Sequence, residues 1–289
     1  MCGFPIIHLD RHLKVLVQTH KRCVAMCEEF RRTSSEEGFD RRVVRVLTPG
    51  TLIDEPFLNP YENNYLLAVG ASGPKVATEA GGQDEDVHSD ASNICTNLQE
   101  IPLGIAWIDV STGEFFAQHS TVGGLKDDIA RIGPREVVLH PSLKEQPSHP
   151  IRLAVAEEGS FVSYISPSHI PPGTVDFTYP AFYADDLIAV SSSPPALEPV
   201  FTEHETSAIS VLTAFLQANL LEHMPLLSRP ARQGRQDRMQ IDSQTIKALE
   251  IKEGIREGGV TGSLMSVVKR TVTNSGTRLL ARWLCKFTM

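Results

Sequence analysis

The sequence has few cysteines and no long hydrophobic run. Five cysteines in 289 residues are too few for a disulfide scaffold, and the odd number leaves at least one unpaired. A reducing compartment is therefore the simpler interpretation. The apolar run at 66–69 is typical of the longest available, whereas about 20 such residues are needed to cross a bilayer. We therefore expect that the chain is not an integral membrane protein.

Several catalytic motifs are missing as well. The dipeptide Gly-Lys never occurs, so there is no G-x-x-x-x-G-K-[ST] phosphate loop, and the glycines at 254–262 lack the lysine and the preceding strand. H-E-x-x-H and G-x-S-x-G are absent. The first residues have neither the charged and apolar regions of a secretory signal nor an Arg/Ser-rich composition. We expect no enzyme activity, ATP hydrolysis, cofactor, metal or targeting sequence in this chain.

What is present has globular composition, with 41% hydrophobic and 21% charged residues, and a length that suits about two domains. The net charge of −8 argues against a dedicated nucleic-acid binder. That charge is unevenly distributed, because residues 1–50 and 228–289 are basic and residues 51–227 are acidic. The simplest explanation of this uneven distribution is that the charged side chains lie on solvent-exposed surfaces.

The first 165 residues alternate between strand and helix patterns, which predicts a mixed sheet with helices against it. Apolar spacing predicts helices at 9–18, 125–132 and 151–158, and strands at 24–26, 43–47, 65–69, 103–110, 114–118, 136–140 and 161–165. The strands at 103–110 and 114–118 form a hairpin around Gly113. Thr48-Pro49-Gly50-Thr51 predicts a type II turn in which Gly50 takes a positive φ. Residues 70–100 have no periodicity and are expected to form a long loop.

The rest of the chain predicts a change of architecture. Residues 166–200 are rich in proline and serine and are typical of a domain linker. Residues 201–289 are expected to be all-helical, with Asp242 as an N-cap and apolar stripes that need a facing surface. The stripes are Ala208, Val211, Leu212, Phe215 and Leu216, and Leu279, Leu280, Trp283 and Leu284.

Two groups of residues could hold a metal. Asp109 ends a buried strand before a turn, the position at which ribonuclease-H-like nucleases keep a metal-binding carboxylate, but no convincing second and third acid can be identified. The alternative is that Asp109 caps the turn by local hydrogen bonds. His20, Cys23 and Cys27 lack a fourth ligand and the paired spacing of a zinc site, so we interpret them as structural.

The basic C-terminal part offers candidate DNA contacts. Arg278 and Arg282 are one helical turn apart and follow Arg270, so all three could contact phosphates. A solvated helix face is the alternative, and no interleaved aromatic residues favour a base-stacking platform.

Taken together, these stretches resemble the MutS family of DNA mismatch-repair proteins. Within that family they are most similar in character to the fungal mitochondrial members. The similar stretches follow the family order: Gly3-Phe4-Pro5, Val44 to Leu52 (V-R-V-L-T-P-G-T-L), Leu103 to Phe115 (L-G-I-A-W-I-D-V-S-T-G-E-F), Pro134 to Leu139 (P-R-E-V-V-L), Met239-Gln240-Ile241-Asp242, Gly262-Ser263-Leu264 and Arg278 to Leu284 (R-L-L-A-R-W-L).

The resemblance implies a domain division and a fold: the end of a mismatch-recognition domain at 1–47, a connector at 48–165, a linker at 166–200 and the start of a helical core at 201–289. The implied fold class is α/β followed by all-α. The connector would have a ribonuclease-H-like mixed sheet but no nuclease activity. The family's Phe-x-Glu wedge lies upstream of Met1. The resemblance places its ATPase domain, and long helices that face the apolar stripes, beyond Met289, so the chain is expected to be a fragment. For full-length members of the family, the resemblance implies that they bind mismatched DNA, that they use ATP with magnesium as cofactors, and that they form dimers. It implies a mitochondrial location, with the nucleus as the alternative.

The leading hypothesis is thus a non-enzymatic connector that transmits conformational change in a mismatch sensor. The alternatives are a metal-dependent nuclease that uses Asp109, or a partner-binding module that acts without DNA. Under the leading hypothesis, the chain's own DNA binding is expected to be weak, salt-sensitive and indifferent to mismatches.

Overall fold

The computed structural model describes residues 3–32, 38–53, 63–70, 99–166, 201–225, 227–234, 241–256 and 259–285. The helices are η1 Ile6–His8, α1 Leu9–Lys14, the π-helix η2 Val15–Thr19, α3 Leu125–Ile132, η4 Pro141–Lys144, α4 Pro150–Glu157, α5 Glu203–Leu220, η7 Leu221–His223, α6 Ser243–Ala248, α7 Leu264–Val268 and α8 Asn274–Leu284. The strands are β1 Val24–Arg31, β2 Phe39–Leu47, β3 Tyr65–Gly70, β4 Pro102–Asp109, β5 Glu114–Thr121, β6 Glu136–Leu139, β7 Phe161–Tyr164 and β8 Ala231–Arg232. Nearly all of the predicted loop and linker lies outside the described residues.

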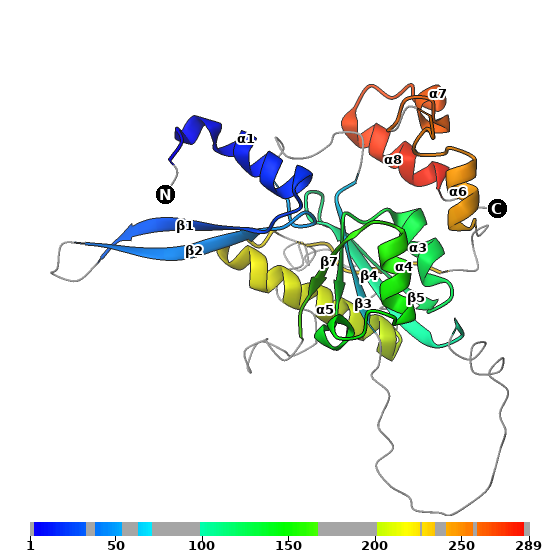
Figure 1. The fold of residues 1–289 in the computed structure, drawn as a ribbon, viewed down its shortest axis with the longest axis horizontal. Coiled ribbons are helices and arrows are strands. Elements are labelled where there is room, and N and C mark those ends of the chain that lie inside the picture. The colour runs from blue at the N-terminus through cyan, green and yellow to red at the C-terminus, as the bar shows by residue number, and fades with distance from the viewer. Residues whose placement is uncertain are drawn as a thin grey trace, which may run out of the picture.

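A six-stranded mixed sheet organises the centre of the molecule, as the strand and helix alternation predicts. Its order is β7-β6-β3-β4-β5-β8, with antiparallel pairs at β3-β4 and β4-β5 and parallel pairs at β3-β6, β6-β7 and β5-β8. The predicted hairpin is confirmed, and Gly113 at its turn has a φ of 75°. Strands β1 and β2 form a separate antiparallel ribbon that projects from the sheet (Figure 1).

Helices cover both faces of this sheet, and the side chains of each strand alternate between the two covers. Leu66 and Ala68 of β3 pack with α5, whereas Tyr65, Leu67 and Val69 pack on the opposite side with α3 and α4. This is the period of two expected for a strand that is buried on both faces.

The expectation that residues 201–289 are all-helical and separate from the sheet is wrong in two respects. Helix α5 lays its stripe, including Leu212, Phe215 and Leu216, against β3 and β4 rather than against a surface beyond Met289. Strand β8 extends the sheet next to β5. The close approach of α5 requires Gly70 and Gly104, because a Cβ on Gly104 would lie 2.1 Å from the carbonyl oxygen of His204.

The three C-terminal helices pack on one another and on the α3 side of the sheet. Helix α6 begins after Asp242, which occupies the predicted N-cap position, and Ile241 packs in the small core around Ile246. The side chain of Thr273 accepts a hydrogen bond from the amide of Gly276 and so caps α8. Trp283 of the predicted α8 stripe is 60% exposed. Among the described residues, no helix is long and apolar enough to cross a membrane.

Candidate functional site

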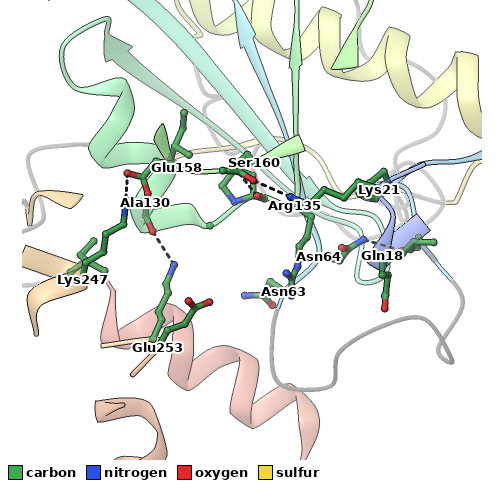
Figure 2. A pocket seen from close by; sticks show the side chains of 18 of the residues that line it. Gln18, Lys21, Asn63, Asn64, Ala130, Arg135, Glu158, Ser160, Lys247 and Glu253 are labelled. Carbon is green, nitrogen blue, oxygen red and sulfur yellow. Dashed lines mark hydrogen bonds and ion pairs between the residues drawn. The ribbon is translucent and has the colours of Figure 1, made fainter. Parts of the chain in front are cut away.

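A cleft of about 810 Å³ lies where the N-terminal segment, the central sheet and the C-terminal helices meet (Figure 2). The N-terminal segment supplies Gln18 and Lys21, and residues 133–135 and 158–160 come from the turns that precede β6 and β7. The C-terminal segment closes the cleft with Ile246, Lys247 and residues 252–255. Polar contacts join the three parts around its rim, from Lys21 to the carbonyl of Gly159 and from Lys247 to Glu158.

The junction between the N-terminal segment and the sheet is built around one buried carboxylate. Glu136 is fully buried, and its Oε2 accepts hydrogen bonds from the hydroxyl of Thr48 at 2.5 Å and from the amide of Gly50 at 2.7 Å. Its Oε1 accepts from the hydroxyl of Ser163 at 2.5 Å. Burial raises the pKa of Glu136, while these three hydrogen bonds act in the opposite direction. Lys21 adds a second link by donating to the carbonyl of Gly159.

The turn at 48–51 meets this carboxylate, and its predicted geometry is wrong. Gly50 is not among the glycines with positive φ, so the turn is not type II. Glycine is needed there for space instead, because a Cβ would lie 2.7 Å from Cδ1 of Leu66 and 2.9 Å from Cβ of Glu136. The turn therefore packs closely against the sheet, and this tertiary contact is the reason that position 50 requires glycine.

On the opposite side of the cleft, a second carboxylate holds the C-terminal segment. Oε1 of Glu158 accepts a hydrogen bond from the hydroxyl of Ser243 at 2.8 Å and pairs with Nζ of Lys247 at 2.9 Å. The Glu158 side chain is 7% exposed and the Lys247 side chain 58% exposed, so solvent reaches the lysine side of the pair. The amide of Ser243 also donates to Asp127 in the first turn of α3. Helix α6 is therefore attached to the sheet layer at its N-terminus.

Lys252 attaches the same segment to the other end of α3. Its Nζ donates to the carbonyls of Ala130 and Arg131, both at 3.0 Å, in the last turn of the helix. Those carbonyls have no intrahelical partners and carry the negative end of the helix dipole, which favours a cation. Desolvation lowers the pKa of Lys252, and the charge of Arg131 acts in the same direction. Gly133 leaves room for this ammonium group, since a Cβ there would lie 2.9 Å from it.

A smaller cleft of about 170 Å³ adjoins the first and shares Asn63, Gly133, Arg135, Lys252 and Glu253 with it. Arg131 forms one wall, where its guanidinium lies over the ring of Trp107. The Arg131 Nη2 atom donates to Gln118 at 2.9 Å and to Asp128 at 3.1 Å. Its Nη1 atom is buried without a hydrogen-bond partner.

The three arginines that the sequence predicts as DNA contacts differ in how accessible they are in the structure. Arg282 pairs with Glu114 at 3.0 Å and lies over the ring of Phe116, so its guanidinium is already engaged by the sheet. Arg278 is half-buried, and its Nε lacks a hydrogen-bond partner. Arg270 is exposed between α7 and α8. Arg270 is therefore the most accessible of the three for contact with a phosphate.

Asp109 has the turn-capping geometry. Its Oδ1 accepts from the amide of Ser111 at 3.0 Å and from the Ser111 hydroxyl at 2.5 Å, and its Oδ2 accepts from the amide of Asn64. Within the described ranges, no group of three or more His, Cys, Asp or Glu residues could hold a metal ion. The hydrogen bonds of Asp109 therefore favour the turn-capping alternative. Cys23 and Cys27 are exposed free thiols.

The sequence analysis did not select the residues that build the junction, namely Glu136, Glu158 and Lys252. Glu136 carried one usable signal, a charged residue at the start of the otherwise apolar strand Glu136-Val137-Val138-Leu139. Buried carboxylates require donors, so its position predicts a polar partner but not which one. Glu158 and Lys252 lie in polar stretches and carry no comparable signal.

Three family profiles match the chain in order: MutS domain I over residues 1–56, MutS domain II over 94–165 and MutS domain III over 244–286. Proteins described as DNA mismatch repair protein MutS are similar to most of the chain. The one from Bartonella quintana is 30% identical over 288 residues, which are 97% of this chain and 28% of that protein. The one from Dinoroseobacter shibae is 30% identical over 289 residues, with 98% and 28% covered. That from Nitrobacter hamburgensis is 29% identical over 288 residues, with the same shares. The chain thus spans about 28% of the length of these relatives.

Proposed function

The chain belongs to the MutS family of DNA mismatch repair proteins, and from that premise we propose that it is the coupling part of a mismatch-recognition protein. The observation that carries the proposal is the cleft, because residues from all three family-matched segments line it. Binding of mismatched DNA, the use of ATP with magnesium, and dimer formation are proposed for the whole polypeptide, of which this chain is the connecting portion.

The polar contacts at the junction explain how coupling would work. The carboxylate of Glu136 holds the turn at 48–51, and the carboxylate of Glu158 holds α6. Glu136 is the first residue of β6 and Glu158 precedes its neighbour β7, so displacing either attached segment would disturb the same pair of strands. Discrete hydrogen-bonded contacts of this kind have made and broken states, which is the property a conformational relay requires.

Hydrogen exchange on the full chain tests the coupling. Glu158→Gln removes the charge that binds Lys247, whereas Glu157→Gln removes the charge of an adjacent glutamate that pairs with Lys126 at the surface. We expect Glu158→Gln to speed exchange of the amides of α6 and also of Gly50, whose amide donates to Glu136. Glu157→Gln should change neither. An effect confined to α6 would contradict coupling across the sheet.

Gel shifts on fully paired and G·T duplexes test the DNA part of the proposal. Contacts between the basic ends and phosphates should give weak binding that falls by about 0.9 log units per log unit of salt for each phosphate neutralised. We expect no preference between the duplexes from this chain alone. A tenfold preference for the mismatch would contradict this account, and capture of a protein partner without any DNA binding would favour the partner-binding alternative.

The cellular location is a separate part of the proposal. The sequence resemblance to fungal mitochondrial members favours mitochondria for the whole protein, with the nucleus as the alternative. Fractionation of cells that express the tagged whole protein would distinguish the two.

A further inference from the structure

The turn between α4 and β7 is contacted by both flanking segments, and the two contacts are made to neighbouring residues. The carboxylate of Glu158 accepts from Ser243 and Lys247 of the C-terminal segment. The carbonyl of the next residue, Gly159, accepts a hydrogen bond at 3.2 Å from Nζ of Lys21 in the N-terminal segment. Figure 2 shows Lys21 and Lys247 on opposite sides of Glu158. Two segments that are far apart in the sequence therefore meet at one dipeptide.

The backbone of Lys21 has a conformation that lysine seldom adopts. Lys21 follows the π-helix η2, and its φ is 49°, in the left-handed region. The amide of Arg22 donates to the carbonyl of Leu16 at 2.9 Å, so Lys21 occupies the left-handed position that ends the helix. Glycine is the usual residue there, because it has no Cβ to be strained. The helix end by itself therefore does not explain a lysine at this position.

The side-chain contact of Lys21 supplies an explanation. Its ammonium group reaches the carbonyl of Gly159, which a glycine at position 21 could not do. Sparsely populated backbone conformations cluster at functional sites, where the surrounding structure holds them. The hydrogen bond is exposed to solvent, so its free energy is small. Its importance therefore lies in which two segments it joins rather than in its strength.

The turn that receives these contacts is built to transmit a displacement. Gly159 has a φ of 68°, and a Cβ there would meet no atom within 4 Å, so its conformation rather than its packing requires glycine. The hydroxyl of Ser160 donates to the carbonyl of Pro134 at 3.2 Å and attaches the turn to the one before β6. Because Glu158 and Gly159 are consecutive and the peptide bond between them is rigid, a displacement of Gly159 carries Glu158 with it.

We propose that the turn at 158–160 links the N-terminal and C-terminal segments directly, and that Lys21 is its positioning residue. This inference rests on the proposed coupling function and adds a second, shorter route to it. The first route runs from Glu136 through the paired strands β6 and β7, whereas this one passes through a single dipeptide. While Lys21 holds the carbonyl of Gly159, Glu158 stays in place for α6, and a movement of the N-terminal segment moves the anchor of α6.

Hydrogen exchange of the full chain, resolved by residue with NMR, tests the link. Lys21→Met keeps a long side chain in the same backbone conformation but removes the donor. The amide of Ile246, which donates within α6, should then exchange about threefold faster, although the hydrogen bond that is removed is made to Gly159. Arg22→Met removes the neighbouring exposed cation and should leave Ile246 unchanged. Faster exchange confined to the N-terminal segment would overturn the proposal.

Lys21→Gly separates the link from a purely local role in ending the helix. Glycine suits the left-handed position, so the amides of His20 and Arg22, which close the end of η2, should exchange no faster than in the parent. The amide of Ile246 should still exchange as fast as in Lys21→Met. Parent-like exchange of Ile246 in Lys21→Gly would mean that Lys21 acts only on its own helix, and the proposal would fail.

Double variants distinguish this link from the route through the sheet. In Glu158→Gln the anchor of α6 is already weakened, so adding Lys21→Met should change the exchange of Ile246 little further, and additive effects would overturn the link. In Glu136→Gln the turn is intact, so Lys21→Met should keep its full effect. If Lys21→Met leaves Ile246 unchanged while Glu158→Gln still speeds exchange of Gly50, the link fails and the proposed coupling function stands.

Discussion

Replacing Gly104 by alanine should loosen α5 from the central sheet. Gly104 lies in β4 beneath the first turn of the helix, and a Cβ there would be 2.1 Å from the carbonyl oxygen of His204 and 2.5 Å from the amide nitrogen of Glu205. Carbon and oxygen ordinarily approach no closer than about 3.3 Å. Both neighbours are backbone atoms, so the helix itself must retreat by about 1 Å.

The cost follows from what the retreat disturbs. Helix α5 buries Leu212, Phe215 and Leu216 against the sheet, and a gap of about 0.5–1 Å forfeits a quarter to a half of each affected dispersion contact. Overpacked cores lose about 1–3 kcal/mol. Because no side chain can rotate out of the way, we expect the upper end, about 3 kcal/mol of unfolding free energy.

Urea unfolding of the full chain, followed by circular dichroism, measures this loss. At a slope of about 2 kcal/mol per molar, the midpoint should fall by roughly 1.5 M. Gly38→Ala is the control, because its Cβ would meet only the Arg32 side chain at 3.7–3.8 Å, and it should stay within about 0.5 kcal/mol of the parent. Equal midpoints for the two variants would refute the packing of α5 on this sheet.

Four further outcomes are expected. Burial raises the pKa of Glu136 above its ordinary value of 4.5, so the stability that this residue contributes is complete below pH 4.5 and is lost as the pH rises through the folded pKa. Glu136→Gln should flatten the dependence of the unfolding free energy on pH, as measured by urea unfolding. Parallel plots of unfolding free energy against pH for the variant and the parent would contradict this. A double-mutant cycle of Arg282→Ala and Glu114→Ala should give a coupling of about 0.2–1 kcal/mol, since the two side chains are 25% and 46% exposed, and no coupling would contradict the ion pair. Arg270→Ala should reduce the salt slope of DNA binding by about one, and Arg282→Ala by less; the reverse order would show that Glu114 releases Arg282. After cleavage at a protease site inserted in 167–200, the two pieces should co-elute without denaturant because α5 and β8 pack on the sheet, and their separation would argue against that packing.

Local patterns predicted most elements because the signals they rest on are local. Alternation of side chains specifies the hairpin around Gly113, and helical spacing specifies α3. The cap at Thr273 and the turn at Asp109 depend on donors within a few residues of the acceptor, so the sequence contains both partners. The partners of Glu136 lie 27 to 88 positions away, and no spacing rule connects them.

The sequence alone determined the order of the elements, the mixed character of the sheet and the resemblance to the family, since each follows from neighbouring residues or from their order. Only the tertiary structure decided what the apolar stripe of α5 covers, because a stripe specifies that a surface is needed but not which one. It also assigned Gly50 to close packing rather than to a left-handed turn, and it brought Arg131 and Lys252 to one cleft. Such contacts join residues distant in the chain, and the geometry that brings them together exists only once the sheet has formed.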